Sequence, residues 1–129
     1  MAEVSKKAEY KFVEPQSKIY TFSDVLSEKR IIYQVVKMQD SLLVFVNDKD
    51  QMDCNNLALA MLSRFSDVPS CTTLMGNIME QCGSNIARRL SKKLNKAVFL
   101  SFNLAEDRLL VPLVEKRLLE EIQRHPENF

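Results

Sequence analysis

The chain has 129 residues, 46% of them apolar, which is enough to bury one hydrophobic core but leaves no room for two. Its 18 basic and 17 acidic side chains give a formal charge of +1, so the overall balance favours neither nucleic acid nor an acidic membrane as a partner. Apolar runs such as 42–46 and 57–62 are far shorter than the roughly 20 residues of a membrane-spanning helix, so we expect a soluble protein without membrane partners.

The cysteines and the first residues indicate the compartment. Cys54, Cys71 and Cys82 are an odd number at wide spacing, and no Asn-x-Ser/Thr glycosylation site occurs. This pattern suits a reducing compartment better than a disulfide framework. Residues 1–11 lack the apolar stretch of a secretory signal. We therefore expect a cytoplasmic protein, with the nucleus as a second compartment.

The N-terminal end is predicted to be an arm. Residues 1–16 are rich in charge and include Pro15, which removes a backbone donor and biases the preceding residue toward an extended conformation. We therefore predict a flexible charged N-terminal arm over 1–16 and a single domain over 17–129. In that domain, the β-branched and aromatic residues of 18–22 predict a short strand, and the polar segment 23–30 predicts a connector.

A hairpin is predicted next. Residues 31–38 and 41–46 have strong β propensity, and the two residues between them, Gln39 and Asp40, match the loop length of a tight hairpin. Residues 47–56 are rich in Asp and Asn, whose side chains stabilise turns.

Residues 57–62 have two interpretations. Ala, Leu and Met favour a helix, whereas a short and wholly apolar run also suits a strand buried on both faces. Residues 63–70 are a polar loop with Pro69, and the β-prone run 71–75 beyond them makes a second hairpin the alternative to a helix.

Two amphipathic helices and one more strand complete the prediction. Ser84 is the expected N-cap of a helix that runs to about Asn95, and residues 97–102 form a strand. The final helix has apolar side chains at helical spacing, tolerates Pro112 in its first turn and stops at Pro126. The fold class is therefore α+β, with a mainly antiparallel sheet of five to six strands and flanking helices.

The strand patterns suggest a partner subunit. An antiparallel sheet with one face in water alternates polar and apolar residues, but Leu42-Leu43-Val44-Phe45-Val46 and Ala97-Val98-Phe99-Leu100 are apolar on both parities. Two helices cover one face of such a sheet. The second face is then covered either by a partner subunit, in a sandwich about 10 Å thick, or by the arm and loops of this chain.

The sequence offers no set of residues typical of catalysis. Gly76 and Gly83 are the two glycines, which excludes a glycine-rich phosphate loop. The one histidine, His125, stands at the end of the last helix, where an interaction with the helix dipole is the simpler role. The cysteines lack the spacing of a zinc site. We therefore expect no enzyme activity, no catalytic residue, no metal and no cofactor.

The first amphipathic helix carries a basic cluster, Arg88, Arg89, Lys92, Lys93 and Lys96. A solvated helix face is the simplest interpretation, because aromatic residues that could stack on bases are absent from it. Binding to nucleic acid and docking onto an acidic patch of a protein partner are the alternatives.

Several short motifs follow one another in a recognisable order: Asp40-Ser41-Leu42, Asn56 to Met61, Ser63-Arg64-Phe65, Val68-Pro69-Ser70, Thr73 to Gly76, Ile86 to Lys93, Asn95-Lys96, Val98 to Leu104 and a tail from Leu110 to Phe129. Their order and spacing resemble the proteasome assembly chaperone 4 family over roughly residues 31–129.

The resemblance implies a non-catalytic chaperone that forms a heterodimer with proteasome assembly chaperone 3 and helps alpha-type subunits of the 20S proteasome assemble into a ring. It also implies a strand for residues 57–62. As partner contacts we predict Leu43 and Phe45, or their neighbours of opposite parity Leu42 and Val44, together with the docking charges Arg88, Arg89 and Lys92. An adaptor subunit of the vesicle-trafficking kind and a small nucleic-acid binder are the alternative functions.

Overall fold

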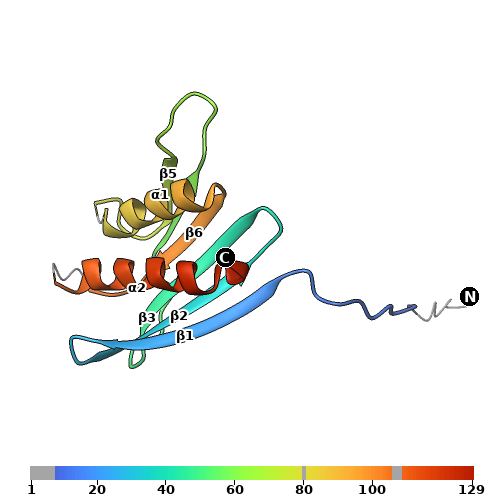
Figure 1. The fold of residues 1–129 in the computed structure, drawn as a ribbon, viewed down its shortest axis with the longest axis horizontal. Coiled ribbons are helices and arrows are strands. Elements are labelled where there is room, and N and C mark those ends of the chain that lie inside the picture. The colour runs from blue at the N-terminus through green and yellow to red at the C-terminus, as the bar shows by residue number, and fades with distance from the viewer. Residues whose placement is uncertain (1–7, 80, 106–108) are drawn as a thin grey trace, which may run out of the picture.

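The computed structural model describes residues 8–79, 81–105 and 109–129, which form a six-stranded sheet and two α-helices. The elements are β1 (Lys18–Leu26), β2 (Lys29–Lys37), β3 (Ser41–Asp48), β4 (Leu57–Met61), β5 (Ser70–Met75), α1 (Cys82–Leu94), β6 (Ala97–Phe102), α2 (Leu110–Arg124) and the 3₁₀ turn η1 (Pro126–Asn128). The strand order is β1-β2-β3-β6-β4-β5 (Figure 1); β3 and β6 are parallel, and the other neighbours are antiparallel. The predicted fold class is confirmed.

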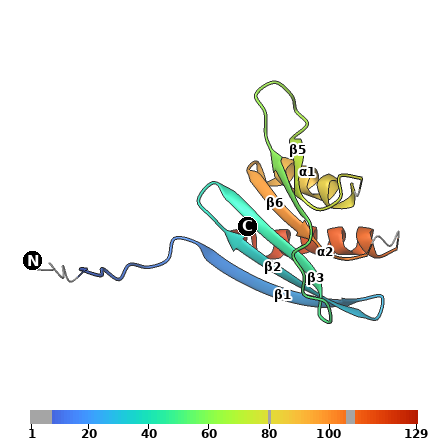
Figure 2. The ribbon, with the colours of Figure 1, turned by 180° about the vertical axis from the view of Figure 1, so that it is seen from behind.

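Both helices pack on the same face of the sheet, as Figures 1 and 2 show from opposite sides. Alternate residues of the central strands point into this layer, because side chains along a strand alternate between the two faces. The buried core combines these strand residues with the apolar stripes of the helices: Ile31, Tyr33, Val35, Leu42, Val44, Val46, Val98, Leu100, Ile86, Leu90, Val114 and Leu118.

Residues 23–30 are not a connector, which corrects the prediction. They complete β1 and begin β2, and the two strands join through Ser27 and Glu28, both with positive φ (49° and 66°). A two-residue turn in which both residues have positive φ has a backbone twist that matches the right-handed twist of the strands it joins. The polar composition of this segment favoured a connector, but β1 is an edge strand of the sheet and tolerates polar side chains. Thr21 and Ser23 are exposed to water there.

Residues 57–61 form strand β4, as the resemblance implied and against their helix propensity. The strand lies between β6 and β5 and is antiparallel to both, with Ala58 and Ala60 buried. Small residues let helix α1 pack closely over this strand, so tertiary context outweighs the preference of Ala and Leu for a helix. Residues 62–69 are the loop that leads to β5 (Figure 1).

The hairpin of β2 and β3 and strands β5 and β6 are confirmed, with ends within two residues of the predicted ones. The predicted N-cap is wrong: α1 begins at Cys82, so Ser84 lies inside the first turn, and Gln81 makes no side-chain capping bond. Helix α1 ends at Leu94, and its C-cap Asn95 is left-handed, with a φ of 55°. Helix α2 carries Pro112 in its first turn and ends before Pro126, as predicted.

Candidate protein–protein interface

An apolar row crosses five strands on the face of the sheet that lies away from the helices. The register places Ile19 opposite Val36, Val36 opposite Leu43, Leu43 opposite Phe99, and Phe99 opposite Leu59. Residues directly opposite one another share a face of the sheet, so these side chains form one continuous strip. Ile19 is 69% exposed, and the other four are partly exposed.

We call this surface the open face and define it by the five residues of the row and their neighbours Ile32, Phe45 and Met61. Figure 2 shows that the described helices leave it uncovered. The chain itself covers one end of the open face. The Sγ atom of Cys54 lies 3.7 Å from the hydroxyl oxygen of Ser101, which is fully buried. The side-chain carbonyl of Asn47 accepts a hydrogen bond from the backbone amide of Asp53 at 3.2 Å. The loop between β3 and β4 therefore covers this edge and leaves the apolar row accessible.

The structure separates the two alternatives for the partner contacts on β3. Leu42 and Val44 are fully buried beneath the helices, so they belong to the core and are not available to a partner. Leu43 and Phe45 lie on the open face and are partly exposed. The parity that points away from the helices is thus the one that can contact another subunit, and the prediction for Leu42 and Val44 is wrong.

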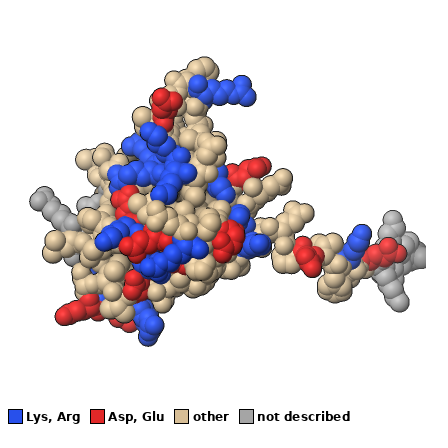
Figure 3. Space-filling model, viewed as in Figure 1, with Lys and Arg blue, Asp and Glu red and all other residues tan. Residues whose placement is uncertain are grey.

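The predicted docking charges lie on the opposite side of the molecule, where Figure 3 shows basic side chains gathered over α1. Arg89 donates two hydrogen bonds to the carboxylate of Glu115 on α2, one from Nε and one from Nη2 at 2.7 Å. This pairing raises the pKa of Arg89. Arg88 is half-buried, and its Nε has no hydrogen-bond partner among the described residues. Lys92 is exposed.

A buried charge network, which the sequence analysis missed, joins β1 to α2. The Glu121 carboxylate is 3% exposed; it accepts a hydrogen bond from the Tyr20 hydroxyl and one from Arg117 at 2.5 Å, and Arg117 also binds Asp24 at 3.0 Å. Burial acts to raise the pKa of Glu121, but the bonds from Tyr20 and Arg117 outweigh it, so the pKa is lowered. Helical spacing reveals the Arg117–Glu121 pair, but the contacts with β1 depend on the tertiary fold.

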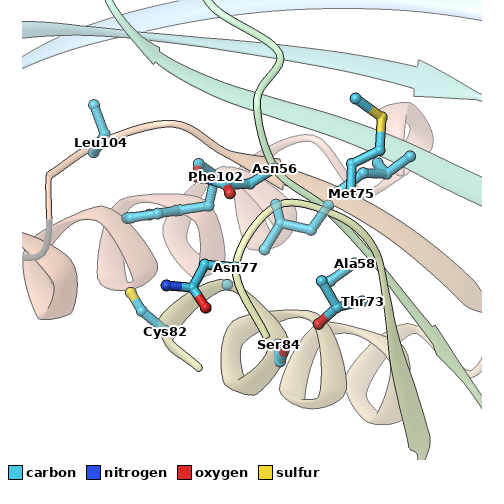
Figure 4. Close-up of a pocket in the computed structure, with 12 residues that line it drawn as sticks. Asn56, Ala58, Thr73, Met75, Asn77, Cys82, Ser84, Phe102 and Leu104 are labelled. Atoms are coloured by element: carbon cyan, nitrogen blue, oxygen red, sulfur yellow. The ribbon is translucent and has the colours of Figure 1, made fainter. Parts of the chain in front are cut away.

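The pocket of Figure 4 lies where the start of α1 meets the ends of β4, β5 and β6. Thr73, Cys82 and Phe102 are among its lining residues, and its cavity volume is about 30 Å³, which is about the share of one water molecule. Organic ligands occupy pockets of about 300–1,000 Å³. This pocket is therefore too small for a cofactor of ordinary size.

The remaining chemical groups are dispersed. Among the described residues, no cluster of three or more His, Cys, Asp or Glu side chains is arranged to hold a metal ion. His125 ends α2, and its Nδ1 lies 3.3 Å from Glu127. Cys54 is exposed, and Cys71 and Cys82 are half-buried. No helix in the described part of the chain is long and apolar enough to cross a membrane.

Comparison with known proteins identifies the family. The family model of proteasome assembly chaperone 4 matches residues 30–104. Proteasome assembly chaperone 4 of mouse and that of human are each 37% identical to the chain over 112 residues, which cover 86% of this chain and 89% of each relative. The chain belongs to the proteasome assembly chaperone 4 family.

The fold agrees with this family. One chain of the crystal structure of a novel chaperone complex for yeast 20S proteasome assembly has a TM-score of 0.66 and 13% sequence identity, and the match covers 85% of this chain and 98% of that one. The residues that match the family model of proteasome assembly chaperone 4 run from β2 to just beyond β6. They include most of the open face and the basic helix α1, whereas β1 and α2 lie outside the match.

Proposed function

We propose that the chain is a non-catalytic chaperone that promotes alpha-ring formation of the 20S proteasome core particle as a heterodimer with proteasome assembly chaperone 3. Membership of the proteasome assembly chaperone 4 family supports the assembly role. The crystal structure with a similar fold belongs to a chaperone complex, which agrees with a function in association with another subunit. The proposed clients are alpha-type subunits of the proteasome.

The main support for the proposed heterodimer is the apolar row of the open face. Soluble monomers seldom expose contiguous apolar patches of more than a few hundred Å², and larger ones mark interaction sites. Ile19, Val36, Leu43, Phe99 and Leu59 form a continuous apolar strip across five strands of the open face. A second sheet packed about 10 Å away would remove this strip from water, and we propose that proteasome assembly chaperone 3 supplies that cover.

The other parts of the proposal follow from the same arrangement. Residues 17–129 act as one assembly-chaperone domain. Of the predicted arm over 1–16, residues 1–7 lie outside the described part of the chain, and residues 8–16 are exposed and form no helix or strand. Membership of a family of assembly chaperones supports a non-catalytic role. We place the protein in the cytoplasm, with the nucleus as a second compartment, because three widely spaced cysteines suit a reducing environment.

The test is co-expression of the chain with proteasome assembly chaperone 3, followed by light scattering on a sizing column. We expect a one-to-one complex that retains alpha-type subunits. Leu43→Asp places a charge in the centre of the apolar row and should abolish the complex, and Ile19→Asp at the exposed edge of the row should weaken it. Leu113→Asp is the matched control, because Leu113 is an exposed leucine of α2 on the helix side.

Thermal unfolding of each variant separates loss of binding from loss of folding. A monomer that ignores proteasome assembly chaperone 3 would contradict the proposal and favour an adaptor subunit of another complex. A complex that tolerates both Leu43→Asp and Ile19→Asp would place the interface elsewhere on the chain.

A further inference from the structure

A second surface of the chain lies over the first half of α1, on the side opposite the open face. Two hollows meet there at Arg88. One has a volume of about 220 Å³ and is lined by Val68 and Pro69 of the β4–β5 loop and by Asn85, Arg88, Arg89 and Lys92 of α1. The other has a volume of about 290 Å³, and Thr72, Ile78 and Gln81 are among the residues that line it with Arg88. We call the two hollows together the α1 groove.

The charge of the α1 groove is positive and only partly neutralised. Helix α1 has no acidic residue along its whole length. Glu115 pairs with Arg89, whereas no carboxylate among the described residues pairs with Arg88 or Lys92. The half-buried Arg88 also has a buried Nε without an acceptor in the described structure, which is an unfavourable state for a charged donor. An incoming carboxylate would satisfy this guanidinium group.

The α1 groove also presents apolar side chains to water. Val68, which lines the first hollow, is 62% exposed, and Ile78, which lines the second, is 75% exposed. A ligand that fits this lining carries apolar side chains as well as negative charge.

We propose that the α1 groove binds an acidic segment of a protein client, with a carboxylate at Arg88 and an apolar side chain against Val68. Arg88 and Lys92 supply the charge recognition, and the β4–β5 loop supplies the apolar contact. A nucleic acid fits less well, because α1 presents no aromatic side chain for base stacking. The identity of the client as a proteasome alpha-type subunit rests on the proposed function, whereas the chemistry of the segment rests on the groove alone.

The test uses fluorescently labelled overlapping peptides that cover the alpha-type subunits of the proteasome, titrated with the full chain alone and in complex with proteasome assembly chaperone 3. We expect acidic peptides that contain an apolar residue to bind, with an affinity that falls as salt is raised. Lys92→Glu should weaken binding about tenfold, and Arg88→Glu by at least as much. Val68→Ser should weaken binding of the same peptides without changing its salt dependence.

Lys116→Glu is the matched control, because Lys116 is an exposed lysine of α2 outside the groove, and it should leave binding unchanged. Lys92 and Val68 are exposed, so their variants test the proposal even if Arg88→Glu fails to fold. The inference would be overturned if basic peptides bound the parent chain as tightly as acidic peptides do. It would also be overturned if acidic peptides bound Lys92→Glu as tightly as they bind the parent chain. Tighter binding of polyuridylate RNA to the same residues would overturn it too, because the groove would then be a phosphate site.

The result also distinguishes this inference from the proposed function. Loss of peptide binding by every variant and by the parent chain, with the heterodimer intact, overturns the groove and leaves the assembly role standing. Peptide binding by a chain that does not bind proteasome assembly chaperone 3 would support the groove and overturn the proposed heterodimer.

Discussion

Leu42 and Leu43 are neighbours on β3 that face opposite sides of the sheet, so they test the two roles of the strand with the same substitution. Leu42 is fully buried under the helices, whereas Leu43 lies in the middle of the open face. Leu42→Ala leaves a cavity in the core, which should lower the free energy of unfolding of the isolated chain by about 2–5 kcal/mol. Leu43→Ala should lower it by less than about 2 kcal/mol, because water already reaches part of that side chain.

The order of the two effects should reverse for association. Once a partner covers the open face, Leu43 becomes a central contact, and central contacts that are shielded from water cost about 2 kcal/mol or more when truncated. That corresponds to a dissociation constant about 30-fold higher. Leu42 makes no contact at that face, so Leu42→Ala should change the dissociation constant of folded protein by less than about threefold.

Urea unfolding of the isolated chain measures the first quantity, and calorimetric titration with proteasome assembly chaperone 3 measures the second. The reasoning is refuted if Leu43→Ala destabilises the isolated chain as much as Leu42→Ala does. It is also refuted if Leu43→Ala leaves the dissociation constant unchanged, because the apolar row would then face water in the complex.

Three further predictions concern stability. The pKa of Glu121 is lowered in the folded chain, so the unfolded chain binds more protons in acid. The free energy of unfolding should therefore fall as the pH drops below the ordinary pKa of 4.5. Urea titrations at a series of pH values measure this dependence, and Glu121→Gln should flatten it. Glu28→Gly should stabilise the β1–β2 turn by about 1 kcal/mol in the same titration, since glycine adopts the positive φ of 66° without strain; a loss of stability would contradict the left-handed assignment. Gly76→Ala should lower the melting temperature, because the φ of Gly76 is +100° and an added Cβ atom would lie 2.1 Å from Oδ1 of Asn56. Gly83→Ala is the control, because its added Cβ atom would lie 3.3 Å from the nearest atom. Equal melting temperatures for the two variants would refute the clash.

The elements that the sequence predicts well are those whose local pattern and tertiary role agree. The hairpin of β2 and β3 combines β-branched residues with a two-residue loop, and both helices combine an apolar stripe with a stop signal. The β4 segment shows the opposite case. Its Ala and Leu residues favour a helix, and its place between β5 and β6 depends on contacts far along the chain, which no local pattern contains.

The open face could be predicted only in part. Apolar residues on both parities of β3 and β6 predicted a sheet with two faces to cover, but the choice between Leu42 and Leu43 depends on which side the helices occupy. The strip itself also needs the register between strands, since Ile19, Val36 and Leu59 are far from Leu43 in sequence. The parallel pairing of β3 with β6 brings Phe99 beside Leu43, and nothing in either segment specifies that pairing.

The two proposed surfaces differ in chemistry in a way that suits different lifetimes. An apolar face such as the one around Leu43 and Phe99 is costly to expose, so a partner that covers it should stay bound and form part of the folded unit. The α1 groove is charged and already in contact with water, so occupation of it should be fast and should respond to salt. Since the sheet separates them, the chain can keep one partner while it exchanges another. An assembly chaperone needs this division, because it must release its client and remain folded afterwards.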